Sequence, residues 1–171
     1  MVSNQALDTN AGYGANADLG ITTHGSNWYF TVCAVMTVSS LAFMGMSRSV
    51  IRSHRLFHYI TAGLTFTAAI AYFSMGSGLG ATAVLVEFPR SGSSQGLDAA
   101  GTREFFYARY IDWAITTPLL LLDLLLTAGV PAPTIAITIL ADELMIITGL
   151  IGALVPSTYK CKFLSNQYNY E

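Results

Sequence analysis

The chain has 171 residues and a formal net charge of −2; 53% of its residues are hydrophobic and only 11% are charged. Soluble domains carry about a quarter charged residues, so this composition favours a membrane protein. No basic block is present, which argues against nucleic acid as a partner. Cys33 and Cys161 form no spaced pair, so the sequence indicates neither a disulfide framework nor a metal site.

The N-terminal region, residues 1–26, is polar and lacks a basic stretch followed by an apolar one. We therefore expect an extracellular tail and not a cleaved signal peptide. Four apolar runs follow, each close to the roughly 20 residues that a helix needs to cross a bilayer. The runs are residues 27–46, 56–75, 104–126 and 134–155. They predict an all-α transmembrane helical bundle over residues 27–155, followed by an atypical polar tail over residues 156–171.

The connections between the runs predict the orientation. The segment "SRSVIRSHR" holds Arg48, Arg52 and Arg55, and basic loops favour the cytoplasmic side. The N-terminus is then outside, and we expect the protein to reside in the plasma membrane. Before the third run, "ATAVLVEFPRSG" is typical of a short strand and turn. The short link "TAGVPAP" predicts that the third and fourth helices are antiparallel neighbours.

The third run, which contains "ARYIDWAITTPLLLLDLLL", carries charges that a lipid-facing helix does not tolerate. Asp112 and Asp123 are eleven residues apart, so they point the same way and lie about 16 Å apart along the axis. The stripe that they share carries four side chains: Arg109, Asp112, Thr116 and Asp123. Intramembrane groups of this kind face the bundle interior and often form proton relays.

Burial disfavours a charged carboxylate, and Arg109 opposes this effect at Asp112. We therefore expect Asp112 to be ionised at rest and Asp123 to be protonated, as a proton acceptor and a proton donor. The competing interpretation is that these charges only hold helices together. In the fourth run, Asp142, Met145 and Gly149 share a face. Gly149 leaves room for a bulky group, although close helix packing explains the glycine equally well.

Three quoted segments carry a resemblance to a known family. "RYIDWAITTPLLLLDL" closely resembles the third helix of the microbial rhodopsins, the bacteriorhodopsin family, and "ADELMIITGLIGAL" resembles their fourth helix. "AIAYFSM" fits the second helix. The resemblance extends over residues 27–159, and Glu143 together with the overall sequence is most similar to fungal opsins. It implies the first four helices of a seven-helix fold.

The resemblance also implies residue roles in an outward, light-driven proton pump. Asp112 matches the primary proton acceptor and counterion, and Asp123 matches the cytoplasmic proton donor. Arg109 matches an arginine that moves toward the release side. Thr116 matches a hydroxyl bonded to the acceptor, and Tyr72 matches a tyrosine of an outer hydrogen-bonded cluster.

The cofactor that the resemblance implies is retinal, held as an imine by a lysine of the seventh helix. Asp142 matches an acid bonded to Thr117 near the retinal ring. The positions that match the retinal pocket are Tyr110, Trp113, Thr117, Leu120, Asp142, Met145 and Gly149. The implied partners are the lipid bilayer, retinal and protons, with homo-oligomerisation left open.

The lysines depart from the family pattern, because Lys160 and Lys162 are the only ones in the chain. We therefore expect an incomplete N-terminal portion that neither attaches retinal in the family manner nor pumps by itself. A read-through intron or an early-stopped gene model near residue 161 is favoured over a genuine short relative.

Two alternatives to the pump stay open at this point. One is a sensory photoreceptor of the same family, and another is a non-photoactive four-helix membrane scaffold. An enzyme is the least favoured, because the sequence shows no nucleophile–base pair, phosphate loop or metal-ligand spacing.

Overall fold

The computed structural model describes residues 4–10, 12, 16–85 and 101–155. Four long helices dominate it: α2 (Thr23–Met46), α3 (Arg55–Gly76), α4 (Ala108–Thr127) and α5 (Ala132–Leu154). All four are long and apolar enough to cross a membrane. The prediction of an all-α membrane bundle is thus confirmed, with each helix within a few residues of the expected run.

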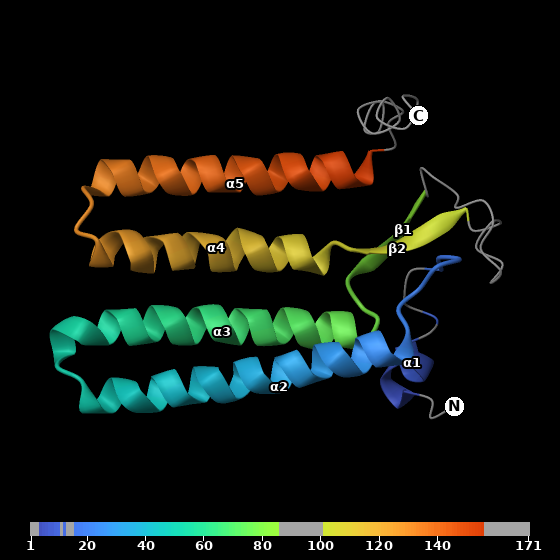
Figure 1. Cartoon of the computed structure of the whole chain (residues 1–171), viewed down its shortest axis with the longest axis horizontal. Helices are drawn as coiled ribbons and strands as arrows, with labels where there is room; N and C mark the ends of the chain where they lie inside the picture. The colour runs from blue at the N-terminus through green and yellow to red at the C-terminus, as the bar shows by residue number, and fades with distance from the viewer. Residues whose placement is uncertain (1–3, 11, 13–15, 86–100, 156–171) are drawn as a thin grey trace, which may run out of the picture.

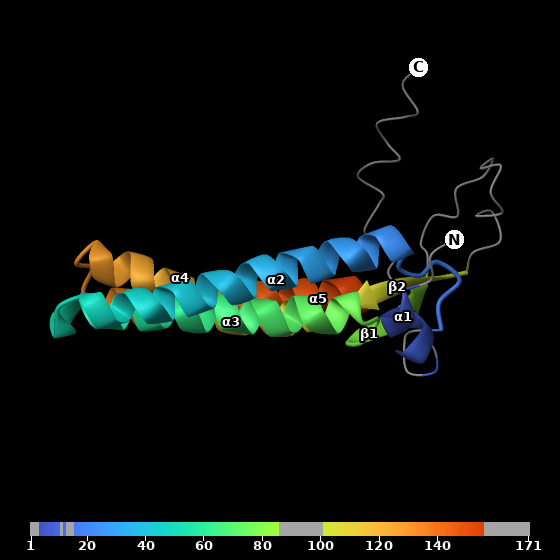
Figure 2. The ribbon, with the colours of Figure 1, turned by 90° about the horizontal axis from the view of Figure 1, so that it is seen from below.

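The helices form an antiparallel row in which each packs on its neighbour in sequence (Figures 1 and 2). A short helix, α1 (Gln5–Asn10), and a small sheet lie together at one end of the row, called here the hairpin end (Figure 1). The opposite end, called the turn end, holds the helix connections. It comprises η1 (Ser47–Ser49), η2 (Arg52–His54) and residues 128–131.

Small side chains explain the close packing of α2 on α3. The core of α3 is rich in buried alanines, which let the helix backbones approach: Ala62, Ala68, Ala69 and Ala71. The buried hydroxyl of Ser40 donates to the Ala62 carbonyl at 2.8 Å. Near the hairpin end, the Ser26 hydroxyl donates to the carbonyl of Gly76. Both hydroxyls are therefore satisfied across the interface, although neither is in water.

The sheet pairs β1 (Ala81–Leu85) with β2 (Thr102–Phe106) in antiparallel register, from Ala81 opposite Phe106 to Leu85 opposite Thr102. The expected strand within "ATAVLVEFPRSG" is present as β1, while residues 86–92 of that segment lie outside the described residues. The expected start of the third span at Glu104 is wrong. Glu104 lies in β2, because its main chain pairs with β1, and the helix begins only at Ala108.

A glycine allows β1 and α4 to meet. Gly80 has φ +71°, a conformation that favours glycine. Its carbonyl accepts a hydrogen bond from the Ala108 amide at 3.0 Å. A Cβ added at Gly80 would lie 2.6 Å from the Cβ of Ala108, closer than two carbons can approach. The first turn of α4 therefore packs directly against Gly80, the residue that precedes β1.

Within the expected tail, residues 1–26, the described residues 4–10, 12 and 16–26 contribute to the fold. Helix α2 begins at Thr23, where the Thr22 hydroxyl caps it by accepting from the Gly25 amide at 3.2 Å. Asn4 donates to the Ser26 hydroxyl at 2.8 Å, which ties the N-terminal segment to the start of α2. Leu19 forms a parallel bridge with Arg103 of β2. This region therefore packs on the hairpin end.

Candidate proton-transfer and chromophore site

The first element of the site is the face of α4 that packs on α3. Asp112 is 8% exposed and Thr116 is 9% exposed, so both are buried there. Thr116, expected to be bonded to the proton acceptor, donates to the main-chain carbonyl of Asp112 at 2.8 Å. A threonine hydroxyl one turn along a helix reaches that carbonyl readily. Among the described residues, Asp112 Oδ1 is buried without a hydrogen-bond partner.

Asp123 lies on the same side of α4, nearer the turn end. Its Oδ2 accepts a long hydrogen bond of 3.4 Å from the Thr61 hydroxyl of α3, and its buried Oδ1 has no partner in the described part of the chain. Sequence reasoning missed Thr61. The only available signal was the hydroxyl pair Thr61 and Thr65, which are four residues apart and share a face of α3.

Arg109, which we expected to oppose the effect of burial at Asp112, contacts helix α2. Its Nη2 donates to the phenol oxygen of Tyr29 on α2 at 3.0 Å. No ion pair with Asp112 forms within the described residues. The Tyr29 ring lies 5.8 Å from that of Tyr72 and 6.0 Å from that of Phe106, between ring centroids. Tyr72 thus belongs to the Arg109 cluster through Tyr29, a residue that the sequence did not single out.

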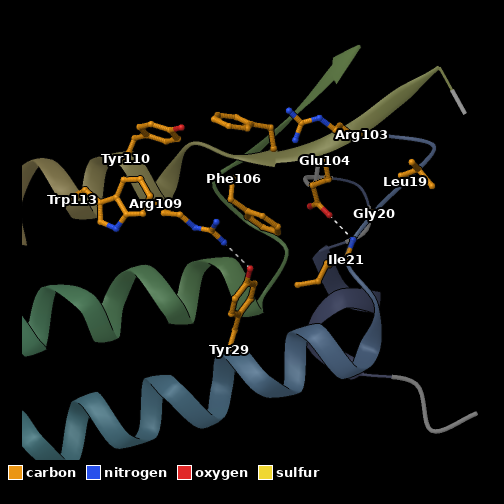
Figure 3. A pocket seen from close by; sticks show the side chains of 11 residues that line it. Leu19, Gly20, Ile21, Tyr29, Arg103, Glu104, Phe106, Arg109, Tyr110 and Trp113 are labelled. Carbon is orange, nitrogen blue, oxygen red and sulfur yellow. Dashed lines mark hydrogen bonds between the residues drawn. The ribbon is translucent and has the colours of Figure 1, made fainter. Parts of the chain in front are cut away.

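Beyond Arg109, a pocket of about 410 Å³ opens at the hairpin end (Figure 3). Its lining comes from the N-terminal segment, α2, β2 and α4: Leu19, Gly20, Ile21, Tyr29, Arg103, Glu104, Phe105, Phe106, Arg109, Tyr110 and Trp113. Arg109 reaches toward Tyr29, while the Glu104 carboxylate is turned to the Ile21 amide, which donates to it at 2.6 Å (Figure 3). This pocket, called here the outer pocket for its place at the hairpin end of the helix row, therefore contains charges of both signs.

The face of α4 toward α5 carries the second set of expected residues. Thr117 donates to Asp142 Oδ2 across the interface at 2.5 Å, so the structure contains the bond expected between them. A Cβ added at Gly149 would lie 3.6 Å from the Tyr110 ring, an ordinary contact distance. Because Gly149 has no side chain, the ring of Tyr110 lies close to the α5 backbone.

Three further residues of this set remain uncovered. Trp113, Leu120 and Met145 are 41%, 55% and 64% exposed. Trp113 contacts Tyr110 with ring centroids 5.3 Å apart. Helix geometry places Trp113, Thr117 and Leu120 on one stripe of α4. The structure thus brings Tyr110, Thr117, Asp142 and Gly149 together between α4 and α5, whereas Trp113, Leu120 and Met145 stay largely exposed.

Comparison with known proteins agrees with this arrangement. The family described as bacteriorhodopsin-like protein matches residues 23–165. The opsin-like protein carO of Fusarium fujikuroi is 57% identical over 160 residues, which cover 92% of this chain and 51% of carO. The chain therefore belongs to the bacteriorhodopsin-like family of microbial rhodopsins, with fungal opsins among its relatives. It spans about half the length of the curated relatives that it matches.

Solved structures show the same fold. The light-driven proton pump LR (Mac) from Leptosphaeria maculans has a TM-score of 0.71 and 38% identity, over 85% of this chain and 60% of that one. The light-driven proton pump CsR from Coccomyxa subellipsoidea has a TM-score of 0.70 and 37% identity, over 81% of this chain and 57% of that one. With its four apolar helices, the chain is an integral membrane protein.

Proposed function

We propose that this chain is the N-terminal four-helix portion of a retinal-binding, light-driven outward proton pump. The observation that carries the proposal is the pair of acids on one side of α4. Asp112 and Asp123 each hold a buried, unpaired carboxyl oxygen among the described residues, at different depths along one helix. Buried unpaired carboxyl oxygens are costly, so they are functional candidates.

The proposed roles follow from position. Asp112 accepts the proton nearer the hairpin end, and Asp123 supplies one from the turn end, so net movement runs toward the hairpin end. Arg109, Tyr29 and Tyr72 lie on that exit side. Thr116 holds the backbone of Asp112 in place. Two similar solved structures are those of light-driven proton pumps, which supports light-driven proton transport as the proposed activity.

Retinal suits the residues that are present. The uncovered face of Trp113, Leu120 and Met145 is apolar, as a polyene requires. Asp112 Oδ1, buried and unpaired, suits a cationic imine as its partner. When bound, retinal supplies the light-driven change in proton affinity. Tyr110, Thr117, Asp142 and Gly149 shape the wall between α4 and α5.

Residues 1–155 contain no lysine. We propose that the imine-forming lysine is supplied by a part of the protein beyond the four helices, and that this chain is inactive alone. We also propose that the hairpin end faces outside, because Arg48, Arg52 and Arg55 lie at the turn end. The expected compartment is the plasma membrane.

A chimaera tests the proposal. Residues 1–155 would be joined to the part of carO that follows its matched segment, and light-induced pH changes would be measured in vesicles with added retinal. We expect outward proton movement in the chimaera, and a loss of about a hundredfold or more on Asp112→Asn, because the proton acceptor is removed. Asp8→Asn, an exposed acid in α1, is the matched control and should transport normally.

The outcomes separate the candidate functions. A visible absorption band with photochemistry but without net transport would indicate a sensory photoreceptor and contradict pumping. Transport that survives Asp112→Asn would remove Asp112 from the mechanism. Neither a band nor transport, from a chimaera that inserts in the membrane, would favour a non-photoactive scaffold.

A further inference from the structure

Glu104 of β2 is a carboxyl group that the proposed mechanism does not use. Its backbone and its side chain each form a hydrogen bond with the N-terminal segment, one on either side of Gly20. The Glu104 amide donates to the Leu19 carbonyl at 2.8 Å, and the Ile21 amide donates to Glu104 Oε2 at 2.6 Å. Oε2 also lies 3.6 Å from where a Gly20 Cβ would stand. The carboxyl is therefore half-buried beneath residues 19–21, on the wall of the outer pocket.

Two opposing effects act on this carboxyl. Burial raises the pKa of Glu104, and the hydrogen bond from the Ile21 amide acts in the other direction. The charged or titratable groups around it, from the N-terminal segment, α2, β2 and α4, are Asp18, Tyr29, Arg103, Arg109 and Tyr110. Its partner on β1 is Ala83, and β1 contains no titratable side chain.

The position of Glu104 is as informative as its surroundings. It lines the same pocket as Arg109, whose helix carries Asp112 three residues further on. Tyr29, the hydrogen-bond partner of Arg109, lines the pocket as well. Among the described residues that line this pocket, Glu104 is the one carboxyl group, and it lies between Arg109 and the N-terminal segment (Figure 3). Asp112 lines a different pocket, between α3 and α4.

We propose that Glu104 exchanges protons between the outer pocket and the solution at the hairpin end, and that in the pump it is the last side chain to carry the exported proton. The second clause rests on the proposed function, whereas the first does not. In the exchange, a protonated water (hydronium) in the pocket breaks one of its O–H bonds and gives that proton to a carboxylate oxygen of Glu104, which leaves a neutral water and forms a carboxyl O–H bond. That bond then breaks toward solution water, which restores the carboxylate.

A titration tests the exchange in the full 171-residue chain. The chain would be labelled with carboxyl-¹³C glutamate, reconstituted in phosphatidylcholine bilayers, and titrated by infrared spectroscopy without retinal. Glu104→Gln keeps an oxygen that can accept from Ile21 but cannot titrate. We expect the difference between parent and variant to contain one carboxyl band that persists to a pH above the ordinary range for glutamate. A band that disappears within or below that range would overturn the proposal.

A second arm tests the exit role in the carO chimaera, with a pH dye in the outer medium. Glu104→Gln should slow the appearance of the proton outside by at least about tenfold while leaving the absorption band in place. Asp18→Ala removes neighbouring contacts to residues 101–102 but leaves Glu104, so it controls for loosening of the N-terminal segment. Unchanged release in Glu104→Gln, or equal slowing in Asp18→Ala, would overturn the exit role. A parent chimaera without transport would reject the pump, while the titration would still decide the exchange.

Discussion

At the scale of single residues, the aspartates differ in their hydrogen bonds. One of them binds two segments of the chain together, and two others have a buried oxygen without a partner among the described residues. Asp18 accepts from the Thr102 hydroxyl at 2.7 Å, from the Thr102 amide at 2.9 Å and from the Gly101 amide at 3.1 Å. These bonds, the hydroxyl first, hold the pKa of Asp18 below its usual value. Asp112 and Asp123 instead keep a buried oxygen unpaired in the described chain. Asp18 is therefore suited to hold the N-terminal segment on β2.

The tether of Asp18 has a defined pH dependence. Its pKa is lower in the folded than in the unfolded state, so its contribution is present above the unfolded pKa and is lost as pH falls through the folded one. Hydrogen exchange at the Gly101 and Thr102 amides, corrected for intrinsic rates, should therefore accelerate on acidification. Asp18→Ala should show fast exchange at every pH, and Asp8→Asn should match the parent. Slow exchange in Asp18→Ala would contradict the tether.

Thr117 provides a second residue-scale prediction. Thr117→Val keeps the shape of the side chain and removes the 2.5 Å bond to Asp142 between α4 and α5. We expect a loss of stability of about 1 kcal/mol, since a half-buried acceptor is left without its donor. Thr148→Val is the matched control, because the Thr148 hydroxyl bonds to carbonyls within α5 and is exposed. Equal thermal unfolding temperatures for the two variants in bilayers would refute the expectation.

At the scale of elements, α4 is the organising helix. One side presents Asp112, Thr116 and Asp123 to α3, and another presents Tyr110 and Thr117 to α5. Its first turn is positioned by the junction at Gly80. A helical repeat of 3.6 residues permits this division, because residues three, four and seven apart return to the same face. The residues that we propose for proton transfer and those that we propose for the chromophore pocket thus lie on different faces of one helix.

The Gly80 junction can be tested against a second glycine with the same backbone conformation. Gly80 and Gly129 have φ +71° and +69°, but only at Gly80 would an added Cβ meet another atom within 4 Å. Gly129→Ala should cost about 1–2 kcal/mol from backbone strain alone. Gly80→Ala should cost more, because Ala108 must also move. Equal losses of stability in thermal or denaturant unfolding would show that the contact between Gly80 and Ala108 does not restrict the position of α4.

At the scale of the whole molecule, the row of helices leaves large apolar surfaces uncovered. Large exposed apolar side chains occur along all four long helices, including Leu41, Phe66, Leu120 and Met145. In a membrane, lipid or further helices cover such surfaces. The uncovered side of Trp113, Leu120 and Met145 is the side where we propose retinal to lie. The arrangement therefore fits a membrane protein in which the proposed chromophore site is enclosed by further helices.

Absorption spectra test this view of the whole molecule. Membranes that contain the 171-residue chain and added retinal should show no red-shifted visible band, because residues 1–155 offer no lysine for an imine. The carO chimaera should develop such a band. A stable visible band from the chain alone would show that Lys160 or Lys162 reaches the chromophore. It would contradict the proposal that the imine-forming lysine comes from a part of the protein beyond the four helices.

Much of this protein is determined by the sequence itself. Long apolar runs define the four helices to within a few residues, since about 20 apolar residues suffice to cross a bilayer. Helical periodicity places Asp112 and Asp123 on one side of α4, and the fourth-helix face of Asp142 and Gly149 follows in the same way. These features depend on neighbours along the chain.

Only the tertiary structure decided the partners of the charged groups. Arg109 meets Tyr29 and not Asp112, and Glu104 belongs to a strand that binds Ile21 and not to a helix. Each of these contacts joins residues about 80 positions apart. Local periodicity carries no information about them, because they form only when α2, β2 and α4 are brought together at one end. The outer pocket and its carboxyl group therefore became visible only in the folded chain.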